Sequence, residues 1–281
     1  MDASTTILGV DFTAAPRVSK PITVAAGRIC GSTFQLERIE TLGSLEAFGE
    51  LLQRPGPWIG GFDFPFGLPR DFIREQGWRG SWAAVTRKVA ALTRDELRAR
   101  CKAYCDARPA GQKFAHRATD LPAGSSPSMK WVNPPVVIML QAAAPALLAA
   151  GVHLPAHGVL GDATRIALEA YPGYLARLVT GDSYKSDTAA KQTAARRAAR
   201  LRIFAAITGA DSPAGLTAVV SPAWRRAIID DASGDHLDAL LCALQAASAA
   251  RQPGFGLPTE IDPLEGWIAS VPSACGHTKC A

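Results

Sequence analysis

Short apolar runs that end at an acidic residue or at a turn signal recur along the chain. The run that contains Asp11 is β-branched and apolar, which predicts a buried strand ending in a loop. The run before Asp63 stops where Pro65 and Gly67 prevent a strand from continuing. The pattern predicts five strands in all, over residues 5–12, 22–29, 34–39, 58–62 and 164–170.

Helical patterns fill most of the remaining sequence. Helices are expected over residues 45–52, 174–179, 188–208, 222–229 and 236–250. Residues 70–160 are rich in Arg, Trp, Pro and helix formers, and predict a largely helical insertion. Strands first, then a strand and helices in alternation, predict an α/β fold with a mixed sheet. Without an internal repeat or a clear linker, we expect one domain over residues 1–281, with an irregular tail at about 252–281.

The longest charge-free span, residues 132–161, has an apolar centre that approaches the length of a membrane helix. Its alanine-rich composition and Pro145 favour a buried helix instead. The first residues lack the basic region of a secretory signal. We therefore expect a cytoplasmic protein that does not bind a membrane.

With 281 residues, of which 48% are hydrophobic and 20% charged, the chain is neither a disulfide-stapled miniprotein nor a disordered tail. The sequence has six cysteines and no recognisable export signal, so free thiols are expected. A zinc site could combine Cys275, His277 and Cys280 with Cys101 and Cys105, but none of these spacings is a standard zinc signature.

The net charge of +5 is compatible with a polyanionic partner without demanding one. Basic residues concentrate on one predicted helix and just before it, where the only acid is Asp187. This basic group consists of Lys185, Lys191, Arg196, Arg197, Arg200 and Arg202. It is either a solvated helix surface or a contact surface for phosphates.

Three carboxylates follow apolar strand-like runs: Asp11, Asp63 and Glu169. A buried carboxylate without partners loses several kcal/mol of hydration, so each of them needs compensation. In open α/β sheets, ligands bind at one end of the strands. Carboxylates that converge there repel one another unless a cation lies between them. A divalent metal is the simplest explanation.

A fourth acidic element opens the last predicted helix. Asp235 and Asp238 are three residues apart on its first turn, where the helix N-terminus favours negative charge. Oxygen-only ligands of this kind suit Mg²⁺ or Mn²⁺, and two such ions about 4 Å apart would support phosphodiester cleavage. Other roles remain open: salt bridges to arginine for Asp11 and Glu169, a turn for Asp63, and a helix cap for Asp235.

These acids lie in four motifs with a definite order. The motifs are Ile7-Leu-Gly-Val-Asp11-Phe-Thr-Ala-Ala-Pro16, Gly61-Phe-Asp63-Phe-Pro65-Phe-Gly67-Leu-Pro69, Glu169-Ala-Tyr171-Pro172 and Asp235-His-Leu-Asp238-Ala-Leu. Over roughly residues 5–250 the sequence resembles the family described as predicted RNase H-like nucleases, domain of unknown function 429. The resemblance implies an RNase H-like core, a mixed five-stranded sheet flanked by helices.

The same resemblance implies roles for individual residues. Asp11 would be the first-strand aspartate, Asp63 the central-strand acid, and Asp238 with Asp235 the metal-binding acids of the last core helix. Glu169 lies in the family's Glu-x-Tyr-Pro motif; apart from the resemblance, the nuclease hypothesis below makes Asp235 and Glu169 additional ligands or residues that orient water. Lys185 matches a recurring basic position that follows the Glu-x-Tyr-Pro motif.

The leading hypothesis is therefore a Mg²⁺- or Mn²⁺-dependent nuclease that acts on DNA or RNA. The basic group and four further residues, Arg70, Arg74, Arg117 and Lys130, would contact phosphates. His236 adjoins the acid pair but is expected to point away from it.

Two alternatives come from different classes of protein. A phosphoryl-transfer protein of the actin-like or sugar-kinase type would need glycine-rich phosphate turns, and no glycine follows Asp11 within its motif. A non-catalytic binding protein could use Trp78, Trp82 and Trp131 as a partner surface, although tryptophan is more often buried.

Overall fold

One mixed sheet of seven strands forms the centre of the computed structural model, which describes residues 5–273. The strands are β1 (Thr6–Asp11), β2 (Ile22–Cys30), β3 (Thr33–Leu42), β4 (Trp58–Asp63), β5 (Val152–His153), β6 (Asp162–Glu169) and β7 (Thr217–Val219). Their order across the sheet is β5-β6-β4-β1-β2-β3-β7. β2 is antiparallel to both of its neighbours, β1 and β3, whereas β4 is parallel to β1 and β6 is parallel to β4.

The sheet has seven strands rather than the expected five. All five predicted strands are present as β1, β2, β3, β4 and β6. The two additional strands lie at the sheet edges and have only two and three residues. A run this short cannot show the alternation by which a strand is recognised in a sequence.

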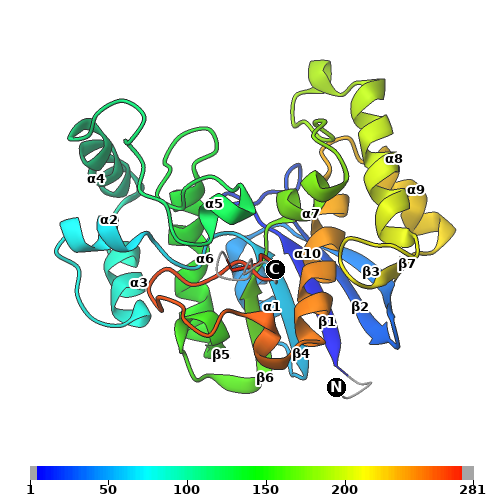
Figure 1. The fold of residues 1–281 in the computed structure, drawn as a ribbon, viewed down its shortest axis with the longest axis horizontal. Coiled ribbons are helices and arrows are strands. Elements are labelled where there is room, and N and C mark those ends of the chain that lie inside the picture. The colour runs from blue at the N-terminus through cyan, green and yellow to red at the C-terminus, as the bar shows by residue number, and fades with distance from the viewer. Residues whose placement is uncertain (1–4, 274–281) are drawn as a thin grey trace, which may run out of the picture.

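Helices flank both faces of the sheet (Figure 1). They are α1 (Leu45–Gln53), α2 (Arg70–Glu75), α3 (Trp82–Ala90), α4 (Arg94–Asp106), α5 (Asp120–Ala123), α6 (Val136–Ala150), α7 (Pro172–Val179), α8 (Ala194–Thr208), α9 (Pro222–Asp230) and α10 (Asp235–Ala250). Three short 3₁₀ helices are η1 (Pro155–His157), η2 (Ala189–Lys191) and η3 (Pro253–Gly256). The long helix expected over residues 188–208 is thus divided, because Thr193 caps α8 by accepting a hydrogen bond from the backbone N–H of Arg196.

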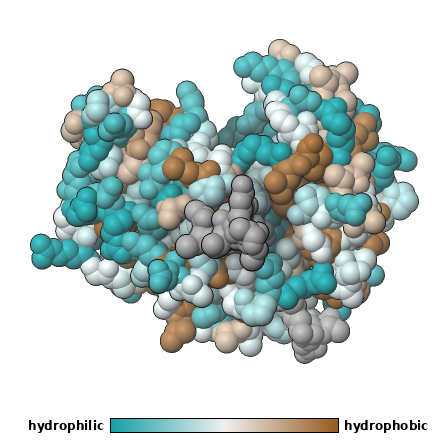
Figure 2. Space-filling model, viewed as in Figure 1, coloured by the Kyte–Doolittle hydropathy of each residue, from teal (hydrophilic) through white to brown (hydrophobic). Residues whose placement is uncertain are grey.

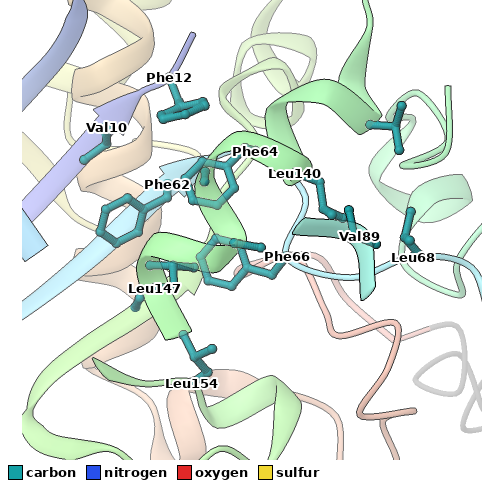
Figure 3. Packing of buried hydrophobic residues seen from close by; sticks show 14 of the residues in the cluster. Val10, Phe12, Phe62, Phe64, Phe66, Leu68, Val89, Leu140, Leu147 and Leu154 are labelled. Atoms are coloured by element: carbon teal, nitrogen blue, oxygen red, sulfur yellow. The ribbon is translucent and has the colours of Figure 1, made fainter. Parts of the chain in front are cut away.

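The sheet separates two hydrophobic clusters, and β1 supplies side chains to both. Leu8 and Val10 pack with α1, α3 and α6, whereas Ile7 packs on the opposite face with α10. This alternation is the two-residue period of a strand that is buried on both faces. Figure 3 shows the first cluster, in which Phe62 lies near Leu147 of α6.

Helix α6 is the helix expected at the apolar centre of the charge-free span. It contains Pro145 and contributes seven buried side chains to the molecule. Among the helices of residues 5–273, none combines the length and the apolar character needed to cross a membrane.

Candidate functional site

Strands β1 and β4 end side by side, each with an aspartate at the same level. Their parallel register pairs Asp11 with Asp63. A phenylalanine follows each aspartate and turns into the core, where the ring centroids of Phe12 and Phe64 lie 4.9 Å apart (Figure 3). This buried contact links the two strand ends, so both carboxyl groups lie at the same edge of the sheet.

Two glycines allow helix α10 to lie directly against these strands. Gly9 and Gly61 are paired in register, and each precedes its aspartate by two positions. A Cβ at Gly9 would lie 2.1 Å from the carbonyl oxygen of Ala239, and a Cβ at Gly61 would lie 2.4 Å from that of Cys242. The close approach brings Asp238, on the first turn of α10, to the two strand-end aspartates. The repeated Gly-x-Asp pattern is a signal of this packing that the sequence analysis did not use.

Asp11, Asp63 and Asp238 form a cluster that we call the aspartate triad. One carboxylate oxygen from each lies within 4.8 Å of the other two. Asp238 is fully buried and the other two are half-buried. Burial raises the pKa of Asp11 well above its ordinary value and raises the pKa of Asp63 to about 7, and the neighbouring carboxylates act in the same direction. The cluster therefore resists carrying its full negative charge unless a cation compensates it.

Two side chains from the segment between α7 and η2 already engage the triad. The ammonium of Lys185 forms an ion pair with Oδ2 of Asp238, and the hydroxyl of Tyr184 donates to Oδ1 over 2.5 Å. Burial by itself would lower the pKa of Lys185, but the carboxylate of Asp238 and the rest of the triad hold it well above its ordinary value. The side chain of Lys185 passes over Gly234, where a Cβ would lie 2.6 Å from that of the lysine. Lys185 was predicted as a nucleic-acid contact, and Tyr184 was not predicted at all.

A cleft with a volume of about 690 Å³ opens above Asp11 and Asp63. This volume lies within the range of small-molecule sites, roughly 300–1,000 Å³. Its lining combines the loop after β1, the start of α6 and the segment that carries Lys185. Besides Lys185, three exposed or half-buried basic side chains line it: Lys20, Arg94 and Arg98. Figure 2 shows the molecule hollowed between its two sides, and in the same view Figure 1 places α4 on one side and α8 on the other.

Glu169 lies at the end of β6 but is held by an arginine rather than by the triad. Both of its carboxylate oxygens accept hydrogen bonds from Arg117, over 2.8 and 2.7 Å, and one also accepts from the backbone N–H of Phe66. Arg117 pairs as well with Asp120, and all three charged side chains are buried. Glu169 thus makes the salt bridge that the sequence analysis had left open. Its carboxylate still borders the cleft.

The structure separates the two aspartates of the last helix. Asp235 lines the cleft and is half-buried, but it is not part of the triad. Burial raises the pKa of Asp235, and the charge of Asp231 raises it further. The side chain of His236 contacts Asp231 instead of the triad, and its Nδ1 lies 3.0 Å from a carboxylate oxygen of Asp231.

The predicted basic helix is less open than expected. Lys191 is exposed at the end of η2, Arg196 is half-buried, and Arg197 pairs with Asp230 at 2.9 Å. None of these three basic side chains lines the cleft. They face the outer surface, so their predicted contact with nucleic acid would lie beyond the cleft.

Arg200 requires a correction, because it is only 3% exposed and cannot reach a phosphate backbone. The helical period of α8 turns it inward. There it donates to the carbonyl oxygen of Ile229 over 2.9 Å and to that of Tyr184 over 2.6 Å. Its position supports the segment that contacts Asp238.

Arginines outside that helix also differ from the expectation. Arg117 is buried in the ion-pair network, Arg70 pairs with Asp262, and Arg74 pairs with Asp71 at 2.8 Å. Lys130 is half-buried outside the cleft. Of these four residues Arg117 lines the cleft, but its buried guanidinium is already paired with Glu169 and Asp120.

The remaining expectations concern tryptophans and cysteines. Trp82 is buried and donates to the carbonyl oxygen of Phe66, so it belongs to the core rather than to a partner surface. Cys101 and Cys105 are buried one turn apart in α4, and burial raises the pKa of Cys101 to about 12, which opposes thiolate formation. The other predicted zinc ligands, Cys275, His277 and Cys280, lie outside the described residues.

The triad has the donor chemistry of a site for Mg²⁺ or Mn²⁺. Its ligands are oxygen atoms only, which these hard cations prefer. Opposite ligands of Mg²⁺ lie about 4 Å apart, twice the usual metal–oxygen distance, and the separations within 4.8 Å require only small side-chain movements. The raised pKa values of Asp11 and Asp63 show a demand for positive charge that Lys185 does not fully meet. Asp11, Asp63 and Asp238 would therefore hold the metal.

Comparison with known proteins gives one family match. A family model described as "Protein of unknown function (DUF429)" matches residues 9–261, a span that includes all three members of the triad. No curated protein and no solved structure matches the chain. Because the matched span covers most of the sequence, the chain belongs to the DUF429 family.

Proposed function

We propose that this protein is a Mg²⁺- or Mn²⁺-dependent nuclease that hydrolyses phosphodiester bonds of DNA or RNA. One observation carries the proposal: three carboxylates from β1, β4 and α10 converge within 4.8 Å beside a cleft. Such a placement is electrostatically costly, as the raised pKa values of Asp11 and Asp63 indicate. A cation that the three carboxylates share would offset the cost.

A bound divalent cation would polarise a phosphoryl oxygen and lower the pKa of a bound water. The protein side chains perform the remaining tasks. Asp11, Asp63 and Asp238 fix the position of the positive charge, and Tyr184 holds the Asp238 carboxylate through its hydroxyl. Lys185 places a second positive charge at the cleft, where it can face the charge that develops on a phosphate. Asp235 borders the same cleft and is suited to orient a water molecule.

An RNase H-like core is part of this proposal. Its support is the set of five adjacent strands β3-β2-β1-β4-β6, with three antiparallel strands followed by two parallel ones. This is a mixed five-stranded arrangement of the kind that the resemblance implies. The edge strands β5 and β7 extend it on either side.

Nucleic acid is the proposed substrate because basic side chains line the cleft that has the triad carboxylates at its base. Arg94, Arg98 and Lys20, of which Lys20 is paired with Asp187, line the cleft, and the whole chain carries a net charge of +5. Positive groups beside a metal site favour the binding of a phosphodiester chain.

The proposal is tested by cleavage of labelled single-stranded, duplex, hybrid and branched DNA and RNA in Mg²⁺, in Mn²⁺ and in EDTA. Asp11→Asn and Asp238→Asn are compared with Asp211→Asn, which replaces an exposed aspartate outside the cleft. Loss of a group that stabilises the transition-state charge slows such reactions by about 10²-fold or more, so we expect this loss in the triad variants alone. Cleavage that persists in folded triad variants would contradict the proposal.

A further inference from the structure

The cleft beside the triad has two walls of different chemistry. One wall comes from the helical segment between β4 and β5, and consists of Arg94 and Arg98 of α4 with an apolar strip at the start of α6. The opposite wall is polar and carries Lys185, Ser186 and Ser233 together with two carboxylates, those of Asp187 and Asp235. A ligand in this cleft would meet carboxylates at its base, guanidinium groups at the rim and an apolar surface along one side.

Arg94 is positioned to contact a substrate bound at the triad. Its Nη2 donates to the carbonyl oxygen of Ala14 over 2.9 Å, and Ala14 lies three residues after Asp11. Within residues 5–273, Arg94 forms no ion pair with a carboxylate. Arg98, one turn further along α4, pairs with the exposed Asp95, at 3.1 Å. Exposed pairs of this kind contribute at most about 1 kcal/mol, so both guanidinium groups remain available to an anion.

The apolar strip faces the same space. Pro134 and Pro135 are exposed, Val136 and Met139 are half-buried, and all four line the cleft. A nucleotide combines an anionic phosphate with a flat base that packs against apolar or aromatic surfaces. The guanidinium groups and the apolar strip together match these two halves.

The size of the cleft separates an unpaired strand from a duplex. Its volume of about 690 Å³ suits one or two nucleotides rather than stacked base pairs. Stacked base pairs with both of their backbones, which border grooves of about 6 and 12 Å, need more room than this volume offers.

We propose that the cleft binds an unpaired nucleic-acid strand, an inference that rests on the proposed function. Arg94 and Arg98 contact the phosphates next to the one at the triad, and the strip from Pro134 to Met139 contacts a base. The shared chemistry is a phosphodiester chain with unstacked bases, and either DNA or RNA supplies it.

Binding of a fluorescein-labelled mixed-sequence 12-mer, measured by anisotropy over a range of salt concentrations, tests this inference. The 12-mer is used as a single strand and as a duplex, in DNA and in RNA, on an Asp63→Asn background that prevents cleavage. Arg94→Ala/Arg98→Ala is compared with Arg87→Ala/Lys102→Ala. The control removes the same charge from exposed positions outside the cleft, and Lys102 pairs with Asp106 much as Arg98 pairs with Asp95.

We expect the single strand to bind about tenfold more tightly than the duplex, because only its bases can pack against the strip. Each phosphate contact contributes about 0.7 to the slope of log K against log salt for single strands. Removing two contacts should reduce that slope by about 1.4 and weaken binding about 20-fold near 0.1 M salt. Equal binding of duplex and strand, or a double variant that behaves like its control, would overturn the inference.

Hydrolysis of bis(p-nitrophenyl) phosphate in Mn²⁺, with the triad intact, separates this inference from the proposed function. The small ester needs the triad but no strand, so the control Arg87→Ala/Lys102→Ala, which lies outside the cleft, should hydrolyse it at the wild-type rate and Asp11→Asn should not. If neither the ester nor any nucleic acid is cleaved while selective strand binding persists, the proposed function fails and this inference stands. If the ester is hydrolysed but duplex binds as well as strand, only this inference fails.

Discussion

Replacing Asp63 by asparagine should change how the stability of the protein depends on pH. The folded protein holds a proton on Asp63 up to about pH 7, whereas the unfolded chain releases it near the ordinary value of 3.8. The folded state therefore binds more protons between these values, and the free energy of unfolding falls as the pH rises through this window. The cause is burial, with the charges of Asp238 and Glu169 acting in the same direction and that of Lys185 opposing them.

The magnitude follows from the width of the window. Each pKa unit corresponds to about 1.36 kcal/mol, so titration of Asp63 between pH 5 and pH 7 should remove up to about 2.7 kcal/mol of stability. Its half-buried side chain makes this an upper value, because solvent screens part of the interaction. Asparagine does not titrate, so the stability of Asp63→Asn relative to the wild type should improve by this amount between pH 5 and pH 8.

Urea unfolding in EDTA at pH 5, 6, 7 and 8 measures this change, with Asp211→Asn as the exposed control. A second series at pH 8 adds Mn²⁺. A cation at 100 times its dissociation constant stabilises a folded protein by about 2.7 kcal/mol, so the wild type should recover most of its loss and Asp63→Asn should not. A stability difference between wild type and Asp63→Asn that stays constant with pH would refute the electrostatic reasoning. Equal stabilisation of both by Mn²⁺ would refute the assignment of the metal to the triad.

Three further substitutions test other parts of the site. Gly9→Ala should destabilise the protein by about 3 kcal/mol or more in urea unfolding, since its Cβ would lie 2.1 Å from backbone atoms of α10. The control Gly49→Ala, at a position with open space around it, should stabilise the protein by about 0.5–1 kcal/mol. Lys185→Met should lower the stability of the protein in EDTA. It should also tighten Mn²⁺ binding, measured by electron paramagnetic resonance, because the ammonium of Lys185 competes with the metal for Asp238. An unchanged Mn²⁺ affinity would exclude this competition. Glu169→Gln should cost about 3–5 kcal/mol by breaking its buried ion pair, while Mn²⁺ affinity remains close to that of the wild type; a large loss of affinity would identify Glu169 as a ligand.

The local pattern of apolar residues was sufficient to predict the strands that carry the site. The apolar runs before Asp11 and Asp63 predicted β1 and β4, and both aspartates lie at the strand ends as expected. β7 was missed because its three residues show no period. The break before α8 was missed although Thr193, a good capping residue, marked it.

The contacts of the site were harder to predict, because they join distant parts of the chain. Lys185 and Asp238 are 53 residues apart, and no local pattern indicates that they form an ion pair. The inward direction of Arg200 depends on how α8 packs against the segment after α7, which composition does not reveal. The close packing of α10 against β1 and β4 could have been predicted, since Gly9 and Gly61 precede the two aspartates at the same spacing.

The most direct test of the account is a crystal structure of the protein grown with MnCl₂, with anomalous scattering used to locate manganese. We predict an anomalous peak between Asp11, Asp63 and Asp238, with carboxylate oxygens from all three at about 2.2 Å, a typical distance for such ligands. The ammonium of Lys185 should then have moved away from Oδ2 of Asp238. No peak at the triad, with Lys185 still paired to Asp238 at saturating Mn²⁺, would contradict the central claim that these three carboxylates form a divalent-metal site.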